Sequence, residues 1–250
     1  MIFSSIEFIF FFIPAVYLIY QFILHTKGSQ KALLVLVVAS FAFYSFWSIQ
    51  HLLLFILSIT INYFGSQFII SKKIANQDCR VPFYFLLTYN LSSLGFFKYA
   101  DFLIFNINRA GGYDFPLLEV LLPLGISFYT FQQISYVVDC RYSKNTYSRF
   151  VDYAMYVAFF PQVIAGPIVC HKEMMDQYKQ GLPSFKRKFL SIGLSIFAIG
   201  LAKKTLIADQ LLRTYTQPIF NAANTGEQIS FLEAWTALLT YSGQIYFDFS

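Results

Sequence analysis

The stretch of sequence that decides the fold lies at residues 32–71, ALLVLVVASFAFYSFWSIQHLLLFILSITINYFGSQFIIS. It contains no Asp, Glu, Lys or Arg. One helical crossing of a bilayer needs about 20 mainly apolar residues, so this stretch is long enough to cross twice. We expect the turn between the two crossings near residues 48–51. The sequence therefore predicts an integral membrane protein.

The composition of the whole chain supports this prediction. Hydrophobic residues make up 57% of the chain and charged residues only 12%, whereas a soluble domain carries about 25% charged residues. The apolar run at residues 8–24 differs from a cleaved signal peptide, because Glu7 stands where such a peptide has basic residues and the run is longer than its apolar region. We interpret it as a retained first helix.

Further apolar segments follow along the chain, at residues 81–97, 120–138, 153–169, 189–202 with an extension toward Leu212, and from residue 234 onward. No soluble domain and no internal repeat interrupts them. The sequence thus predicts an all-α, polytopic integral membrane protein with about seven transmembrane helices and one re-entrant, broken helix.

The short loops indicate the orientation, because basic side chains are retained on the cytoplasmic side of a membrane. The turn around Gln50 has no Lys or Arg. In the loop after residue 97, the basic residues are offset by at least as many acidic residues. Basic residues instead follow the first and third helices, at Lys27, Lys31, Lys72, Lys73 and Arg80. We expect the N-terminus outside, and we interpret the net charge of +5 as a topology signal rather than a nucleic-acid-binding one.

Segment 153–169 breaks the alternation of inside and outside loops. Basic residues lie on both of its flanks, at 141–149 and at 172–188, and its sequence YVAFFPQVIAGPIV (156–169) contains Pro161 and the pair Gly166-Pro167. Backbone interrupted in this way persists at membrane depth only where protein or a wet cavity surrounds it. We expect a re-entrant hairpin that enters from the cytoplasm; a proline-kinked helix that crosses once is the alternative.

Cysteines and histidines give no catalytic or metal assignment. Cys79, Cys140 and Cys170 fall in or beside predicted cytoplasmic loops, where thiols stay reduced, and the adjacent pair Cys170-His171 lacks the second ligand pair of a zinc site. We expect His171, like His25 and His51, to be interfacial or solvated.

Polar residues inside predicted helices are the candidates for a site, since such groups are costly in lipid. In PLGISFYTFQQISYVVDC (123–140), Ser127, Thr130, Gln133 and Tyr136 recur every third residue, with Gln132 beside them. They form one polar stripe on a helix. Two interpretations stay open: hydrogen bonds between packed helices, and the lining of a substrate path.

A second stripe lies in YSGQIYFDFS (241–250), where Tyr241, Gln244 and Asp248 share one helical face. Asp248 is a functional candidate, or it lies at an interface with water or a basic partner. Segment 189–202 is too short to span, so we expect its helix to continue through Lys203 and Lys204, supported by a pair between Asp209 and Arg213. These lysines either snorkel to the interface or contact an anionic substrate.

Four ordered motifs, LLPLGISFYTFQQISYVVDCRY, FVDYAMYVAFFPQVIAGPIV, IGLAKKTLIADQL and YSGQIYFDFS, resemble the bacterial membrane-bound O-acyltransferases, especially the alginate O-acetyltransferase type. The resemblance implies an α-helical enzyme of the bacterial cytoplasmic (inner) membrane. It would pass an acyl group from acetyl-CoA or another acyl thioester, with no bound cofactor, to an exported cell-envelope polysaccharide. We expect its tunnel to be lined by Ser127, Thr130, Gln132, Gln133, Tyr136, Gln162, Gly166, Pro167, Tyr241, Gln244 and Asp248.

The histidine that such enzymes require follows the FDFS motif, and this chain ends before it. The resemblance thus implies the N-terminal portion of one O-acyltransferase domain, inactive alone. A polytopic transporter or flippase is an alternative, as is a non-catalytic scaffold whose partner is an extracytoplasmic acetyltransferase. Besides the polysaccharide, membrane lipid is the partner implied. The acceptor, alginate or peptidoglycan for example, and the acyl group, acetyl, D-alanyl or longer, stay open.

Overall fold

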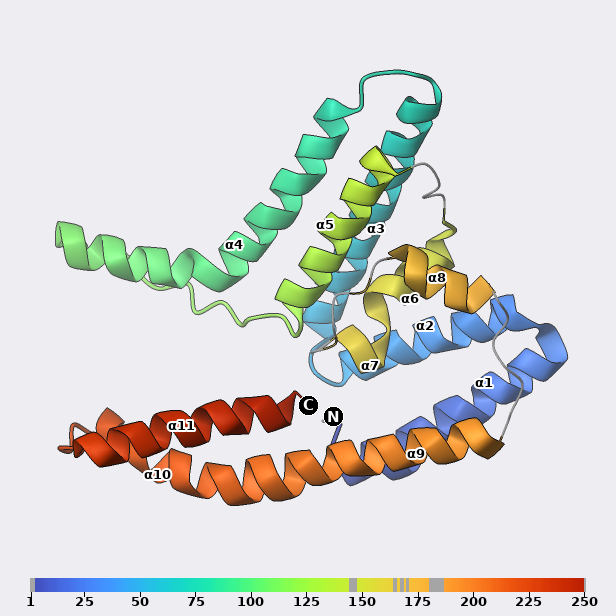
Figure 1. Ribbon diagram of the computed structural model, residues 1–250. Helices are drawn as coiled ribbons and strands as arrows, with labels where there is room; N and C mark the ends of the chain where they lie inside the picture. The colour runs from blue at the N-terminus through green and yellow to red at the C-terminus, as the bar shows by residue number, and fades with distance from the viewer. Residues whose placement is uncertain are drawn as a thin grey trace. The chain divides into compact units, whose positions relative to one another are not determined.

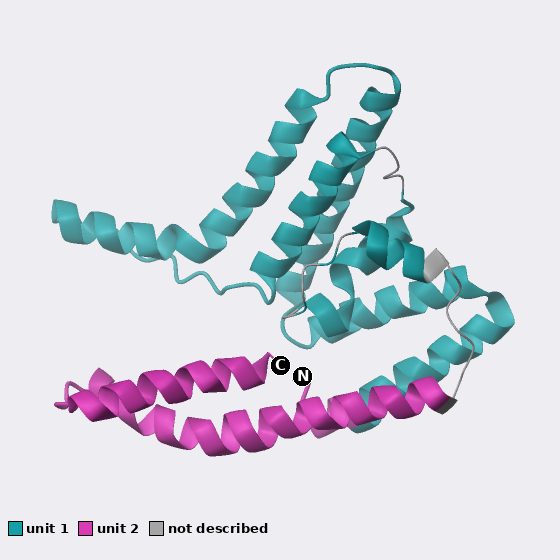
Figure 2. Ribbon diagram, viewed as in Figure 1, with its two compact units in different colours: residues 1, 10–182 teal, residues 2–9, 183–250 magenta. Residues whose placement is uncertain are grey.

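The computed structural model describes residues 3–143, 148–163, 166, 169, 171–179 and 187–249, and within them every regular element is a helix. The prediction of an all-helical protein is confirmed. The chain divides into two compact units, residues 1 and 10–182 and residues 2–9 and 183–250 (Figure 2). Each unit is described by itself.

The first unit begins with α1 (Ile13–Lys27), which continues a π-helical turn at Phe8–Phe12, and goes on to α2 (Ser29–Ser45) and α3 (Ile49–Ile74). The charge-free stretch therefore forms two helices, as predicted. Ser48 ends the turn between them, because its hydroxyl accepts a hydrogen bond from His51 N (3.4 Å) and so caps α3. Phe8–Lys27 and Ile49–Ile74 are each long and apolar enough to cross a membrane.

The next helices of this unit are α4 (Arg80–Gly111) and α5 (Ile126–Tyr142). The predicted start of the fifth segment at residue 120 is wrong. Pro123 disfavours helix in the residue before it, and Gly125 has a positive φ of 69° at the N-cap of α5. Residues 120–125 are therefore not helical. Helices α3, α4 and α5 lie side by side (Figure 1).

A broken segment follows as α6 (Phe150–Ala158) and α7 (Phe160–Val163), and then α8 (His171–Lys179). Nine residues in α6 make about 14 Å of helix, half the thickness of the hydrocarbon core. The break lies beside Pro161, where Phe160 N donates to Ser40 Oγ on α2 (3.1 Å). Residues 153–158 are buried almost completely, so protein surrounds the break; the re-entrant path itself stays a prediction.

The second unit contains α9 (Arg187–Ala202), a π-helix (Lys203–Leu212), α10 (Arg213–Asn224) and α11 (Phe231–Asp248). The helix does continue through Lys203 and Lys204, and Lys188–Asn224 is a third candidate membrane span. The expected pair of Asp209 with Arg213 is wrong for the described residues. Arg213 Nε donates to Gln217 instead (2.9 Å), and Asp209 pairs with Lys204.

Candidate functional site

The polar stripe of α5 lies inside the first unit, in a cluster of buried polar and aromatic side chains that we call the α5 cluster. Each of its members is less than 8% exposed. The helices α3, α4, α5, α6 and α8 and the residues just before α6 contribute them. The members are Ser58, Asn62, Asn90, Gln132, Gln133, Tyr136, Ser148, Tyr153, Tyr156 and His171.

An amide network forms one half of the α5 cluster and joins three helices. Gln133 Oε1 accepts from Ser58 Oγ (2.8 Å) and from Asn62 Nδ2 (2.7 Å), both on α3. Asn90 Nδ2 of α4 donates to Asn62 Oδ1 (2.6 Å), and Asn62 Nδ2 lies 3.1 Å from Asn90 Oδ1. Ser58 and Asn62 reach one partner because residues four apart share a helical face. For Gln133, the interpretation as an interhelical hydrogen-bonding group is therefore supported.

Aromatic rings form the other half of the α5 cluster and enclose His171. The Tyr136 ring centre lies 4.7 Å from that of His171 and 4.6 Å from that of Tyr153, and Tyr156 lies 5.1 Å from His171. The Tyr136 hydroxyl is hydrogen-bonded to Ser148 Oγ (2.8 Å). The prediction of an interfacial or solvated His171 is wrong: it is only 6% exposed, because α8 begins against the tyrosines of α5 and α6.

Three buried polar atoms of the α5 cluster have no hydrogen-bond partner among the described residues: Gln132 Oε1, Gln133 Nε2 and the Tyr153 hydroxyl. An unsatisfied buried polar atom costs about 1–3 kcal/mol, so such atoms are usually met by water or by a ligand. Gln132 Oε1 is a hydrogen-bond acceptor, Gln133 Nε2 is a donor, and the Tyr153 hydroxyl can be either. The α5 cluster therefore has unused hydrogen-bonding groups of both kinds, and its interpretation as a substrate path stays a prediction.

The structure places the remaining predicted residues of the first unit around this cluster or outside the described chain. Thr130 is buried on α5, and Ser127 is half-buried one turn earlier. Gln162 lies on α7, and its carbonyl accepts from Gly166 N (2.9 Å). Pro167 and Cys170 lie outside the described residues.

Sequence reasoning missed the partners of Gln133. Ser58, Asn62 and Ser66 recur every fourth residue inside the charge-free stretch, and all are buried. The rule that singled out the α5 stripe, polar residues on one face of a membrane helix, also applies to this second stripe and would have found it.

The stripe of α11 belongs to the second unit, where Asp248 has a basic partner. Lys204 Nζ donates to Asp248 Oδ1 (2.6 Å) and to Asp209 Oδ1 (3.0 Å). This favours the interpretation of Asp248 as an interfacial residue with a basic partner. The Tyr241 ring packs edge-on against Phe220 at 5.6 Å, and Gln244 is half-buried. No group of three or more His, Cys, Asp or Glu in the described ranges is placed to hold a metal ion.

Replacing Lys204 should destabilise the second unit. Lys204→Met leaves the carboxylates of Asp209 and Asp248 without their shared cation, and its side chain is 36% exposed. We expect a loss of about 1–2 kcal/mol in the free energy of unfolding, between the values of exposed and of buried ion pairs. The midpoint of thermal unfolding in detergent measures it. Arg213→Met at the start of α10 serves as the control, and equal losses in both variants would contradict the role of the ion cluster.

Comparison with known proteins shows which family and which relatives this chain is similar to. Residues 39–250 match the family of membrane-bound O-acyltransferases. The whole chain is 40% identical to a peptidoglycan O-acetyltransferase of Helicobacter pylori, of which it covers 52%, and 34% identical to the probable alginate O-acetylase AlgI of Pseudomonas aeruginosa, of which it covers 47%. It is also 34% identical to the probable alginate O-acetylase AlgI of Pseudomonas putida, of which it covers 50%. The chain thus spans about half the length of the curated relatives it matches.

Proposed function

Because this chain belongs to the membrane-bound O-acyltransferase family, we propose that it acts in the transfer of an acyl group, most simply acetyl, to hydroxyl groups of an exported cell-envelope polysaccharide. The observation that carries the proposal is that the whole chain aligns with relatives named as O-acetyltransferases of two such polymers. The residue types of the α5 cluster suit this chemistry, since amides and hydroxyls bind the neutral polar groups of an acyl thioester.

In the proposed reaction, the bond between the acyl carbon and the thioester sulfur breaks, a bond to the acceptor oxygen forms, and the hydroxyl proton goes to a base and finally to the thiol. Gln133 Nε2 would donate to a carbonyl of the donor, and Gln132 Oε1 would accept from an amide N–H or a hydroxyl. Such contacts would hold the donor in place, which is a large part of enzymatic rate enhancement. Gln132 and Gln133 would therefore position the donor, and neither would act as the catalytic base.

The proposal includes a location and a topology. The protein would lie in the bacterial cytoplasmic membrane with its N-terminus outside and about seven spans, and α6 and α7 would enter from the cytoplasm. The donor, acetyl-CoA or another acyl thioester, would then approach from the side of the basic loops. An extracytoplasmic acetyltransferase is a further proposed partner.

Deleting the gene in its native host should remove base-labile acetyl from one exported polysaccharide, and returning it at its own locus should restore the acetyl. Acetate released by mild alkali from purified polysaccharide fractions measures the effect, and the affected fraction identifies the acceptor. Unchanged acetate in every fraction of the deletion strain would contradict the proposal.

A further inference from the structure

A groove of about 520 Å³ lies between α3 and α4 in the first unit. Its lining is apolar, with Ile61, Phe68, Val81, Phe85 and Leu86 among its residues, and Lys72 is the one charged residue among the described residues that form it. Volumes of roughly 300–1,000 Å³ are typical of small-molecule sites in proteins. The groove is therefore large enough to hold a substantial part of an extended apolar chain.

Close packing of the two helices closes the inner side of the groove. A Cβ atom on Gly65 would lie 2.7 Å from a Leu86 methyl carbon, so the Leu86 side chain packs directly against the α3 backbone at this glycine. On the outer side the lining is open: Val81 is 79% exposed and Phe85 65%. Val81 and Phe85 belong to α4, which packs against the candidate membrane span α3, and exposed apolar side chains at this place suit contact with a lipid chain.

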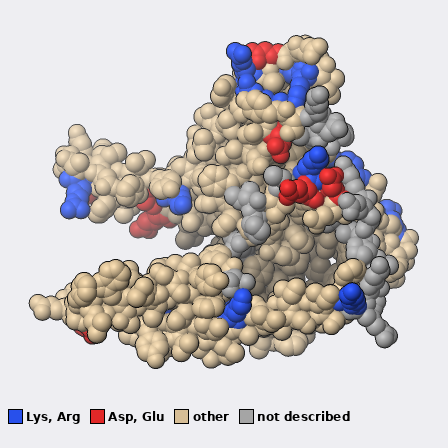
Figure 3. Space-filling model, viewed as in Figure 1, with Lys and Arg blue, Asp and Glu red and all other residues tan. Residues whose placement is uncertain are grey.

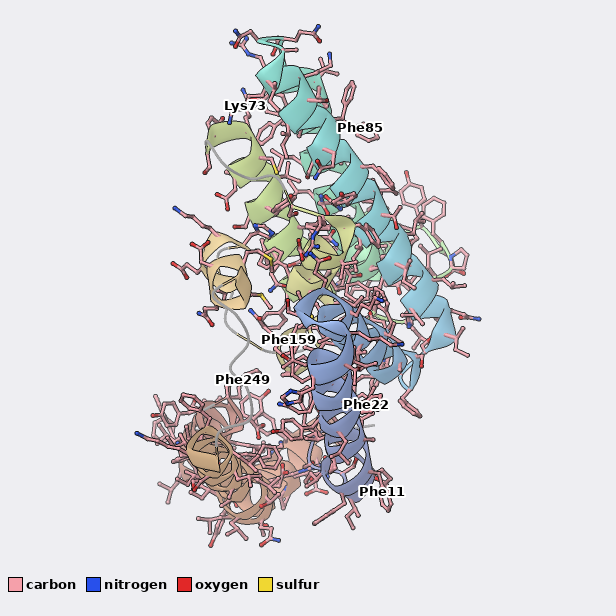
Figure 4. The ribbon with its side chains drawn as sticks, turned by 90° about the vertical axis from the view of Figure 1, so that its right-hand side faces the viewer. Phe11, Phe22, Lys73, Phe85, Phe159 and Phe249 are labelled. Atoms are coloured by element: carbon pink, nitrogen blue, oxygen red, sulfur yellow. The ribbon has the colours of Figure 1, made fainter. Side chains whose placement is uncertain are left out.

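Positive charge lies at one end of the groove. Lys72 belongs to the last turn of α3, and Lys73 and Arg80 lie at the same helix ends, where Figure 3 shows basic side chains together with acidic ones; Asp78 there pairs with Arg80 (4.0 Å). Figure 4 shows Lys73 and Phe85 at this end of the unit. Lys72 Nζ lies 5.2 Å from the centre of the Phe68 ring, and no carboxylate of the described residues forms an ion pair with it.

We propose that this groove binds an anionic phospholipid, with one acyl chain along the apolar lining and the headgroup phosphate at Lys72. The groove complements both the acyl chain and the headgroup of such a lipid. Its apolar lining ends at the Lys72 ammonium group, which has no acidic partner among the described residues. Basic groups between membrane helices on the cytoplasmic side attract anionic headgroups in this way, and a lysine at a helix end reaches the headgroup layer.

Lipid binding to the purified full chain tests the proposal. Native mass spectrometry after titration with dioleoyl phosphatidylglycerol or dioleoyl phosphatidylcholine gives the relative affinity of the two lipids. We expect about fivefold tighter binding of the phosphatidylglycerol, the contribution of one lysine near an anionic headgroup. Lys72→Ala should remove this preference, and Val81→Trp should fill the groove and weaken the binding of both lipids.

Lys98→Ala is the matched control. Lys98 Nζ also lies over a neighbouring aromatic ring, 5.5 Å from the centre of Tyr99, but it does not line the groove, so the variant should keep the preference. Equal affinity of the unaltered protein for the two lipids would overturn the proposal, and so would an equal loss in Lys98→Ala and Lys72→Ala. Because the readout is lipid binding, a failure here leaves the proposed acyl transfer untouched.

Discussion

Asn62→Leu should lower the free energy of unfolding by about 2–4 kcal/mol, one of the two largest effects we expect in this chain. Asn62 is completely buried and bonds to Gln133 and Asn90 on two other helices. Leucine has the same number of side-chain heavy atoms in the same branched arrangement, so the loss arises mainly from the polar groups left behind. Asn90 Nδ2 keeps its bond to Leu86 O (2.8 Å), but Asn90 Oδ1 loses its partner, which costs about 1–3 kcal/mol, and the bonds of Asn62 with Gln133 and Asn90 are lost as well.

Asn106→Leu is the matched control. Asn62 Nδ2 donates to Ser58 O (3.0 Å), and Asn106 Nδ2 likewise donates to the carbonyl four residues earlier (2.7 Å to Phe102 O), but Asn106 is exposed and bonds to no other helix among the described residues. Thermal unfolding in detergent, followed by circular dichroism, should show a clear fall of the midpoint in Asn62→Leu and little change in Asn106→Leu. Similar midpoints in the two variants would show that the amide network contributes nothing.

A double variant separates the network from simple loss of packing. Asn62→Leu/Asn90→Leu removes both members of the amide pair, and replacing both partners by apolar groups of similar shape is often nearly neutral. The double variant should therefore be less destabilised than the sum of the two single variants by at least about 1 kcal/mol. Strictly additive losses would mean that the two amides act independently.

The long apolar helices could be predicted from the sequence, because each depends on a local apolar run, whereas α8 (His171–Lys179) is mostly polar and was not predicted. The turn at Ser48 is an example: a serine before an apolar run caps a helix wherever the chain folds. The start of α5 was missed although its signal was present, since Pro123 and Gly125 are turn residues within the apolar segment 120–138. At the start of this segment, the turn residues prevent a helix although the segment is apolar.

Only the α5 residues of the candidate site could be predicted from the sequence. The α5 stripe follows from spacing along one helix, but the bond between Ser58 and Gln133 joins residues 75 positions apart, and only the packing of α3 against α5 brings them together. The same holds for His171. Its neighbours in the sequence are those of a polar loop, and its burial arises from Tyr136 and Tyr156 on other helices.

Gly166→Ala should cost about 1–3 kcal/mol through local overpacking, a loss confined to the broken segment. A Cβ atom there would clash with Gln162 Cγ and would lie 2.9 Å from both Gln162 Cα and Gln162 O. Two of these three atoms are backbone, so a side-chain rotation cannot relieve the clash. The segment would have to shift against α6, whose residues 153–158 are almost completely buried. Protection of the α6 and α7 amides in hydrogen exchange should therefore fall, together with the midpoint of thermal unfolding.

Gly95→Ala provides the opposite expectation with the same chemical change. Gly95 lies inside α4, and a Cβ atom there would meet nothing within 4 Å. Alanine in a helix interior is more stable than glycine by about 0.5–1 kcal/mol, so this variant should unfold at a slightly higher temperature. The two variants should thus differ by roughly 1.5–4 kcal/mol in opposite directions. If Gly166→Ala were as stable as Gly95→Ala, the close contact between Gly166 and Gln162 would not exist in the folded protein.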